Sequence, residues 1–207
     1  DATAPVLSAV VLNSGAAASS SASVTVAVTA SDPGTGVVDL CVSGSVVSAT
    51  CQPFGSGTVS VQLTSGDGPK TVNVVVHDGA GNPSSSLGDS IDLDTTAPVV
   101  TSVALATGAD FVNTAQVGLS VTATDTGGTG VVAMAIDDQP AGFGAYAPYV
   151  TSQQHGLSPG DGLKVVGVKV RDLAGNESAT VTDSVTLDTA APTATLSINA
   201  GATYAKS

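Results

Sequence analysis

The side chains in this chain whose chemistry suggests a ligand are acidic residues in or beside turns. Each carries carboxylate or amide oxygens, the ligand type that Ca²⁺ requires, and the set comprises Asp67, Asp92, Asp94, Asp125, Asp172 and Asn176. An aspartate before a glycine-rich turn is also a common turn former, because its side chain bonds to backbone groups two residues on. The sequence holds no complete calcium-loop motif, so a Ca²⁺ site and purely structural turns both stand as hypotheses.

The two cysteines, Cys41 and Cys51, form a second chemical pair. A shift of 94 positions, the spacing of the internal repeat described below, leads to Ala135 and Ala145, so the second copy lacks both cysteines together. Joint presence and joint absence are typical of a disulfide, which indicates an oxidising, extracellular setting. Two free buried thiols are the alternative. A metal site is a weaker one, because neither histidine is suitably spaced.

Three aromatic residues form the remaining candidate site. Phe143, Tyr146 and Tyr149 lie close together in the second copy, where the first copy has only Phe54. One interpretation is that they fill the edge of the fold where the cysteine pair is absent. The other is a small contact patch for a glycan or a protein, since carbohydrate-binding sites usually present aromatic rings.

An enzyme site is not expected. His77 and His155 have no matching nucleophile in the other copy of the repeat. The carboxylate pairs occur in both copies, whereas a catalytic pair would be expected only once. No glycine-rich phosphate loop opens a helix. The chain is therefore predicted to be non-catalytic, with no cofactor suggested other than Ca²⁺.

The elements that must position these groups are short β-strands. Val24, Val26 and Val28 alternate with polar or small residues, the period of a strand with one buried face. Segments rich in Asp, Pro and Gly separate such runs and indicate turns. In the first copy, strands are predicted at residues 6–12, 24–30, 37–42, 58–63, 71–77 and 84–92. Cys51 is expected in the loop after the third of these.

An internal repeat divides the chain. Residues 91–98 recur as residues 185–192, and the steps from Asp1 to Asp94 and from Asp94 to Asp188 are 93 and 94 positions. Repetition at this period indicates tandem modules. The predicted modules are residues 1–93 and 94–187, followed by the first strand of a third module in residues 188–207, centred on residues 193–198. Each complete copy is close in length to the ~100 residues of an immunoglobulin-like or fibronectin-III-like β-sandwich. The predicted fold class is therefore all-β, with about seven strands in each sandwich.

Four short motifs carry a resemblance to a known family. They are the opening Asp-x-x-Ala-Pro, the Asp-x-x-Gly-Thr-Gly-Val turn, the Asp-Gly before the strand at residues 71–77, and Val-x-Val-x-Asp-x-Ala-Gly-Asn at residues 74–82 and 168–176. In these the chain resembles bacterial immunoglobulin-like repeats, which occur in tandem in large surface adhesins and secreted proteins. The resemblance implies a spacer role, with ligands bound by only some modules. Related repeats often carry a disulfide across the hairpin that holds the two cysteines.

In a sandwich of this kind, the start of the first strand and two of the turns lie at the same end. Asp94, Asp125, Asp172 and Asn176 are therefore expected near one another at the top of the second module. Asp92 and the turn at Asp67 are expected to approach from the base of the first module. Cadherin-like arrays and some adhesin repeats rigidify their linkers with Ca²⁺, so an interdomain Ca²⁺ site stands here as one hypothesis beside purely structural turns.

Charge and composition exclude several classes of partner. The formal net charge is −12, which opposes binding to nucleic acid or to anionic membrane surfaces and favours cations. No stretch of about 18 apolar residues is present, so membrane insertion is not expected. Hydrophobic residues make up 42% of the chain and aromatic residues only 3%, so the cores must consist mostly of small aliphatic side chains.

The first functional hypothesis is structural: a stalk or spacer segment of an extracellular bacterial surface protein or adhesin, whose partners are neighbouring modules of the same chain. Two alternatives come from other classes. One is a filament or pilus-like subunit, in which residues from Thr193 onward complete the sheet of a neighbour. The other is a module that binds a glycan or a protein through the aromatic residues.

Overall fold

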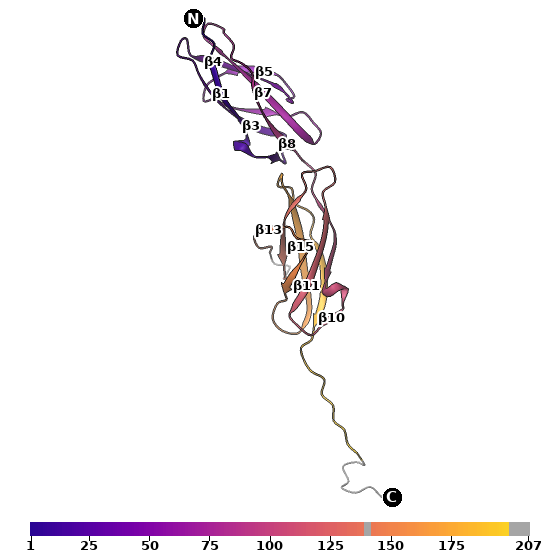
Figure 1. Cartoon of the computed structure of the whole chain (residues 1–207). Helices are drawn as coiled ribbons and strands as arrows, with labels where there is room; N and C mark the ends of the chain where they lie inside the picture. The colour runs from indigo at the N-terminus through magenta and orange to yellow at the C-terminus, as the bar shows by residue number, and fades with distance from the viewer. Residues whose placement is uncertain (139–141, 199–207) are drawn as a thin grey trace, which may run out of the picture.

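The computed structural model describes residues 1–138 and 142–198, and these residues form two β-sandwiches placed end to end (Figure 1). The N-terminus lies at the far end of the first sandwich, and the last described residues run away from the second as a single extended segment. The predicted all-β fold class is confirmed. Within the described residues, no helix is long and apolar enough to cross a bilayer.

The first sandwich packs a three-stranded sheet on a five-stranded sheet. The strand orders are β1-β3-β6 and β2-β8-β7-β4-β5. The pairs are antiparallel except that between β2 and β8, which is parallel. The strands are β1 (Val6–Leu12), β2 (Ala18–Ser19), β3 (Ser23–Ser31), β4 (Val37–Gly44), β5 (Thr50–Pro53), β6 (Thr58–Gln62), β7 (Gly68–Asp78) and β8 (Leu87–Leu93).

The second sandwich repeats this arrangement. Its strand orders are β14-β11-β9 and β10-β16-β15-β12-β13. Again one pair, β10 with β16, is parallel. The strands are β9 (Val99–Leu105), β10 (Phe111–Val112), β11 (Gln116–Thr124), β12 (Val131–Asp137), β13 (Ala147–Pro148), β14 (Ser152–Gly156), β15 (Gly162–Asp172) and β16 (Val181–Leu187).

Each sandwich has a hydrophobic core of its own. Val72, Val74 and Val76 of β7 have no exposed surface, while the residues between them face outward at least in part. The valines at the same positions of β15 are equally buried. The two cores are separate clusters, one built from residues of β1 to β8 and one from residues of β9 to β16. Burying each such side chain contributes about 1.5–3 kcal/mol, and each sandwich buries such a set of its own.

A short 3₁₀ turn breaks the first strand of each sandwich. It spans Asn13–Gly15 as η1 and Ala106–Gly108 as η2, and all three residues of each turn have positive φ. This backbone carries the chain from one sheet to the other, so β2 and β10 join the larger sheets. In the first sandwich Asn13 supports the turn, because its Oδ1 accepts the Thr25 N–H at 2.9 Å.

The six strands predicted for the first copy are observed, with ends displaced by three residues at most. Two predictions were wrong. Cys51 lies in β5 rather than in a loop, because β5 pairs antiparallel with β4. Residues 193–198 form no strand, because no other strand lies beside them in the described part of the chain to complete a ladder. The remainder of that prediction, residues 199–207, lies outside the described residues.

Candidate functional site

The junction between the sandwiches is organised by Asp94, which directly follows β8 and is 1% exposed. Its backbone N–H donates to the Ser19 carbonyl at 3.0 Å, which ties its main chain to the first sandwich. Its Oδ2 accepts hydrogen bonds from the N–H and the hydroxyl of Thr129, both at 2.7 Å. The Asn176 amide donates to the Asp94 carbonyl at 2.8 Å. A single buried residue therefore bonds to both sandwiches.

A second carboxylate, that of Asp67 in the first sandwich, also binds the linker. Asp67, in the turn before β7, accepts hydrogen bonds from the N–H and hydroxyl of Thr95 at 3.1 and 2.9 Å, and from the Thr96 hydroxyl at 2.8 Å. The Thr96 bond, followed by those from Thr95, lowers the pKa of Asp67 below its ordinary value. The charged form of Asp67 thus holds the two residues that follow Asp94.

Three carboxylates meet on the second-sandwich side of this junction. Oxygen atoms of Asp94, Asp125 and Asp172 lie within 4.8 Å of one another. Asp172 is satisfied by its own turn, since its Oδ1 accepts the Asn176 N–H at 2.8 Å and its Oδ2 the Asn176 amide at 2.7 Å. Asp125 is not, because its Oδ2 accepts the Gly130 N–H at 2.7 Å but its buried Oδ1 has no hydrogen-bond partner among the residues that the structure describes.

The surroundings of Asp125 disfavour its charged form. Burial raises the pKa of this carboxyl, and the neighbouring charges of Asp94 and Asp172 raise it further, against the opposing effect of the Gly130 hydrogen bond. A bound cation would relieve both effects, because it neutralises the like charges and supplies a partner for the buried Oδ1. This is the chemistry that the three groups offer together.

Four of the six predicted ligands come together here: Asp94, Asp125 and Asp172 converge, and Asn176 hydrogen-bonds to two of them. The other two do not join them. The oxygens of Asp67 are taken by the linker threonines, and Asp92 lines a groove of about 230 Å³ between the sandwiches. Thr129 was not among the predicted residues, although the Gly-Thr-Gly segment that contains it is part of the repeated motif.

The same contacts recur at the start of the first sandwich. Asp1 accepts the Thr35 N–H at 3.0 Å, and Asn82 donates to the Asp1 carbonyl at 3.3 Å. At the other end, Asp161 accepts the N–H and the hydroxyl of Thr189 at 3.1 and 2.9 Å, as Asp67 does for Thr95. The junction is therefore a repeated device rather than an isolated contact.

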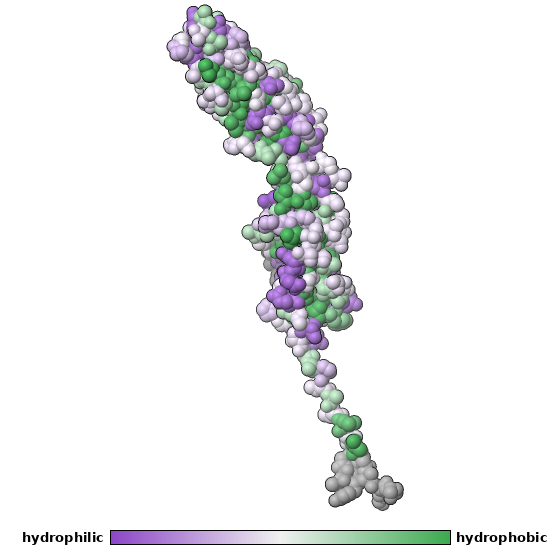
Figure 2. All heavy atoms as spheres, in the orientation of Figure 1, coloured by the Kyte–Doolittle hydropathy of each residue, from purple (hydrophilic) through white to green (hydrophobic). Residues whose placement is uncertain are grey.

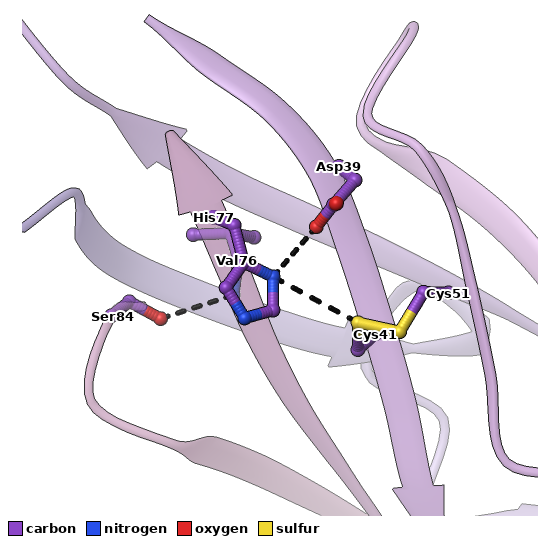
Figure 3. The surroundings of a disulfide bond; sticks show 6 residues. All are labelled: Asp39, Cys41, Cys51, Val76, His77 and Ser84. Carbon is purple, nitrogen blue, oxygen red and sulfur yellow. Dashed lines mark hydrogen bonds and ion pairs between the residues drawn. A yellow bond between two sulfur atoms is a disulfide. The ribbon is translucent and has the colours of Figure 1, made fainter. Parts of the chain in front are cut away.

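The two cysteines lie on the outer face of the larger sheet of the first sandwich (Figure 3). Cys41 of β4 and Cys51 of β5 are directly opposed and joined by a disulfide. Figure 3 also shows His77 of β7 beside the bridge: its Nδ1 lies 2.7 Å from Asp39 Oδ1 and 3.9 Å from Cys41 Sγ. The spacing of His77 in the sequence did not indicate this contact, because the register of β4 and β7 brings together residues that are distant in sequence.

The second sandwich places a tyrosine where the first has Cys51. In β13, Ala147 pairs with Met134, so the preceding residue, Tyr146, lies opposite Ala135, the counterpart of Cys41. The constant shift of 94 positions that pointed to Ala145 was wrong by one residue. Compared with the first sandwich, the second has one extra residue before β13 and one residue fewer between β13 and β14. The shift is back at 94 positions just before β14, because the Val28 N–H donates to the Gly57 carbonyl and, at the equivalent place, the Val121 N–H donates to the Thr151 carbonyl.

Basic side chains cover this tyrosine. The Arg171 guanidinium lies 3.9 Å from the centroid of the Tyr146 ring, and Lys169 Nζ lies 5.3 Å from it and 5.0 Å from that of Phe143. Glu177 forms ion pairs with both cations. The hydrogen bond from Lys169, followed by that from Arg171, lowers the pKa of Glu177 to about 2. Aromatic rings and a paired charge cluster thus occupy the face that carries the disulfide in the first sandwich.

Tyr149 does not belong to an outward-facing patch. Its hydroxyl accepts the Ala123 N–H at 3.1 Å and donates to the Val121 carbonyl at 3.2 Å, and its ring packs on the core. Of the three predicted aromatic contact residues, only Phe143 and Tyr146 lie in the charged cluster. For Tyr149, the structural interpretation, filling the edge of the sandwich, agrees with these contacts.

These features define the chain as a tandem array of β-sandwich modules of the immunoglobulin and fibronectin-III type. Among solved structures it is similar to the fibronectin(III)-like modules of Clostridium thermocellum CbhA, with a TM-score of 0.56, 12% identity, and coverage of 86% of this chain and 94% of that one. A further match is to the FN1–FN3 domains of chicken CNTN1, with a TM-score of 0.49, 14% identity, and coverage of 87% and 66%. No family model and no curated protein matches the chain. At such identities the first similarity shows the fold alone.

Proposed function

We propose that this chain is a non-catalytic spacer segment of an extracellular bacterial surface protein of the adhesin type. Its modules would be residues 1–93 and 94–187, with a further module beginning at residue 188. The observation that carries the proposal is the double attachment of Asp94, whose backbone bonds to the first sandwich and whose carboxylate bonds to the second. A spacer needs a defined angle between its modules, and a shared buried residue favours one.

The linker offers little freedom between these anchors. Thr95 and Thr96 are held by Asp67, and the Thr96 N–H also donates to Asp94 Oδ1 at 3.1 Å. Pro98, whose ring fixes its φ, ends the linker directly before β9. Each residue between the sandwiches is thus restrained by a hydrogen bond or by proline, apart from Ala97. Figure 2 shows the result as a narrow waist between two elongated bodies.

The test is a distance distribution between one label on each sandwich, measured by pulsed electron paramagnetic resonance. The wild-type chain is expected to give a single narrow distribution. Asp67→Ala should broaden it, because both linker threonines lose their acceptor. Asp161→Ala is the matched control, since it removes the equivalent contact with Thr189 beyond the second sandwich and should leave the distribution narrow. A wild-type distribution as broad as that of Asp67→Ala would refute the rigid spacer.

We also propose that Ca²⁺ binds the carboxylates of Asp94, Asp125 and Asp172. The buried Asp125 Oδ1, which has no hydrogen-bond partner in the described part of the chain, supports this, and the close approach of three acidic groups supplies the charge that a hard cation requires. Asp94 and Asp172 already accept several N–H bonds, so water and turn carbonyls would have to complete the coordination shell.

Calcium titration of the melting temperature tests this site. Ca²⁺ should raise the melting temperature of the wild-type second sandwich, and Asp125→Asn should remove the rise while keeping an acceptor for Gly130. Asp92→Asn is the control, because Asp92 lies at the junction but outside the three converging groups. An unchanged melting temperature in the wild type, or a rise that survives in Asp125→Asn, would contradict calcium binding here.

The extracellular location rests on the disulfide. Cys51 is exposed, and a bridge of this kind persists in oxidising surroundings but is rare in the cytosol. Mass spectrometry of the chain isolated without reductant should give a mass two hydrogens below that of the dithiol. Recovery of the free dithiol would argue for an intracellular protein.

A second candidate function is strand donation between copies. The segment 193–198 has no partner strand among the described residues, and its Leu196 and Ile198 are 88% and 76% exposed. Figure 2 shows hydrophobic surface near the described end of the chain. Light scattering distinguishes the functions: a spacer stays monomeric, whereas a strand donor forms polymers that are lost when residues 188–207 are removed.

The glycan- or protein-binding alternative would depend on Phe143 and Tyr146, and binding lost in Tyr146→Ala would support it.

A further inference from the structure

Four side chains with metal-binding atoms share the outer face of three adjacent strands in the first sandwich. In the register of the sheet, Asp39 of β4 pairs with His77 of β7, and Cys41 of β4 pairs with Cys51 of β5. Asp39 and Cys41 are two residues apart, so both point away from the core, into which Leu40 is buried. The four groups therefore form a zigzag across the three strands, with His77 and Cys51 at its two ends and Asp39 and Cys41 between them.

The distances among Asp39, Cys41 and His77 suit a small metal ion, and the bond between Cys41 and Cys51 keeps the fourth group beside them. Ligand atoms of Asp39, Cys41 and His77 lie within 4.8 Å of one another. Zinc–ligand bonds of about 2.0–2.3 Å place neighbouring atoms of a tetrahedral site about 3.3–3.8 Å apart. The separation of 3.9 Å between Cys41 Sγ and His77 Nδ1 is already close to this, while the 2.7 Å contact between His77 and Asp39 must open slightly.

We propose that the dithiol form of the first sandwich binds a thiophilic divalent cation, such as Zn²⁺, through Cys41, Cys51, His77 and Asp39. The disulfide and the metal are alternative states of the same side chains. Two sulfurs, one imidazole nitrogen and one carboxylate oxygen form a ligand set typical of four-coordinate zinc. In either state, β5 is tied to β4, so the edge of the sheet stays closed under oxidising and under thiol-rich conditions.

An external thiol or dithiol supplies the electrons for the change of state. Its thiolate attacks the exposed Cys51 sulfur, the bond to Cys41 breaks, and Cys41 leaves as a thiolate beside His77. A second external thiolate then releases Cys51, and the external thiols end as a disulfide, having supplied two electrons. The two released thiolates take up protons to give the dithiol, and metal binding displaces both of these protons. The His77 Nδ1 ligates in the tautomer that carries the imidazole proton on Nε2.

The site is open to both reactants. Cys51 is exposed, and the side chains of Asp39 and His77 are 39% and 30% exposed. A shallow depression of about 290 Å³, lined by Asp39, Cys51 and three neighbours, lies beside the bridge. The second sandwich provides an internal control, because its counterparts of Cys41 and Cys51 are Ala135 and Tyr146, which offer no thiolate.

Cobalt(II) tests the proposal, because thiolate ligation to it gives a charge-transfer absorption that carboxylate sites do not give. The full chain, reduced with a phosphine and freed of reductant, is titrated with Co²⁺ and then with Zn²⁺. We expect one cobalt per chain, thiolate bands, and displacement by zinc. The oxidised chain should give no such bands. Absence of the bands in the reduced chain would overturn the proposal.

Variants separate the four-ligand site from simple binding by two thiols. His77→Gln and Asp39→Asn should each weaken cobalt affinity, read from the thiolate bands, about ten-fold or more, while Asp161→Asn should not change it. Equal affinity in His77→Gln and in the wild type would overturn the assignment, as would a stoichiometry of one cobalt per two chains. If reduction itself unfolds the first sandwich, zinc should restore its melting transition, and failure to restore it would also overturn the proposal.

Discussion

The two sandwiches close the same edge by different means. In the first, a covalent bond between Cys41 and Cys51 joins β4 to β5. In the second, Tyr146 takes the place of Cys51 and is covered by Arg171 and Lys169. The strands, the cores and the junction contacts are otherwise repeated. The comparison indicates that the fold needs a stabilising contact at this edge. Either a covalent bond or a set of aromatic and charged side chains can provide it.

The two solutions differ in physical character. A disulfide stabilises largely by restricting the unfolded chain, and its contribution changes little with salt or moderate acid. Stacked cations and the Glu177 ion pairs act only in the folded state, and salt or acid weakens them. The second sandwich is therefore expected to be the more sensitive of the two to solution conditions.

Removing the disulfide should give the largest effect. The double substitution Cys41→Ala and Cys51→Ala opens a loop with a sequence separation of 10. The chain-entropy model predicts a loss of about 3 kcal/mol in the free energy of unfolding for a loop of this size. Calorimetry should show that the melting transition of the first sandwich moves down while that of the second stays in place. Parallel movement of both transitions would show that the sandwiches do not unfold separately.

The next largest effect is expected at Asp94, with Asp1 as its matched partner in the first sandwich. Asp94 is buried and accepts two bonds of 2.7 Å from Thr129, whereas the exposed Asp1 accepts bonds of 3.0 and 3.4 Å from Thr35. Hydrogen bonds to a buried charged group are worth about 1.5–3 kcal/mol, so Asp94→Ala should destabilise the second sandwich by about 2 kcal/mol. Asp1→Ala should cost the first sandwich less than about 1 kcal/mol. Equal losses in urea denaturation would contradict this ranking.

Much of this comparison could be predicted from the sequence, because the pattern of hydrophobic residues marks most of the strands. Alternating valines such as Val72, Val74 and Val76 predict a strand with one buried face, and the observed burial agrees. The repeat was visible because the second sandwich copies the turns of the first almost residue by residue. The fold class was therefore predictable, and the acidic turns pointed to the junction.

The pairing of individual side chains was not predictable. β5 has a short polar sequence without an alternating pattern, so nothing marked it as a strand that opposes Cys51 to Cys41. His77 reaches Asp39 only through the register of β4 and β7. A constant shift between repeats cannot reveal one residue gained and one lost around β13. Contacts of this kind depend on register, which local sequence does not determine when the strands are short.

The register around β13 can be tested by transplanting the disulfide. The pair Ala135→Cys and Tyr146→Cys should form a bridge spontaneously, because these positions correspond to Cys41 and Cys51. The bridge would contribute about 3 kcal/mol, and loss of the aromatic contacts would remove about 1 kcal/mol, so a net gain of about 1–2 kcal/mol is expected. Thiol titration and melting with and without reductant measure both outcomes.

The control pair is Ala135→Cys with Ala145→Cys, which the constant shift of 94 would favour. In a strand, adjacent residues point to opposite faces, so a cysteine at position 145 faces away from position 135. This pair should retain two free thiols. A bridge in the control but not at position 146 would show that the assigned register of β13 is wrong.

The smallest expected effect is the acid sensitivity of the charged cluster. The folded-state pKa of Glu177 is lowered from 4.5 to about 2 by Lys169 and Arg171, so its contribution to stability is present above pH 4.5 and is lost as the pH falls towards 2. Wild type should therefore melt slightly above Glu177→Gln at pH 6, and the two should converge near pH 2. High salt should shrink the gap at pH 6, because Glu177 is 39% exposed and its ion pairs are screened.

The first sandwich, whose corresponding position is Pro83, should show no difference between the two proteins at any pH. A gap that stayed constant with pH would mean that Glu177 acts through packing and not through its charge, and the contrast between a covalent and an electrostatic edge would lose its basis.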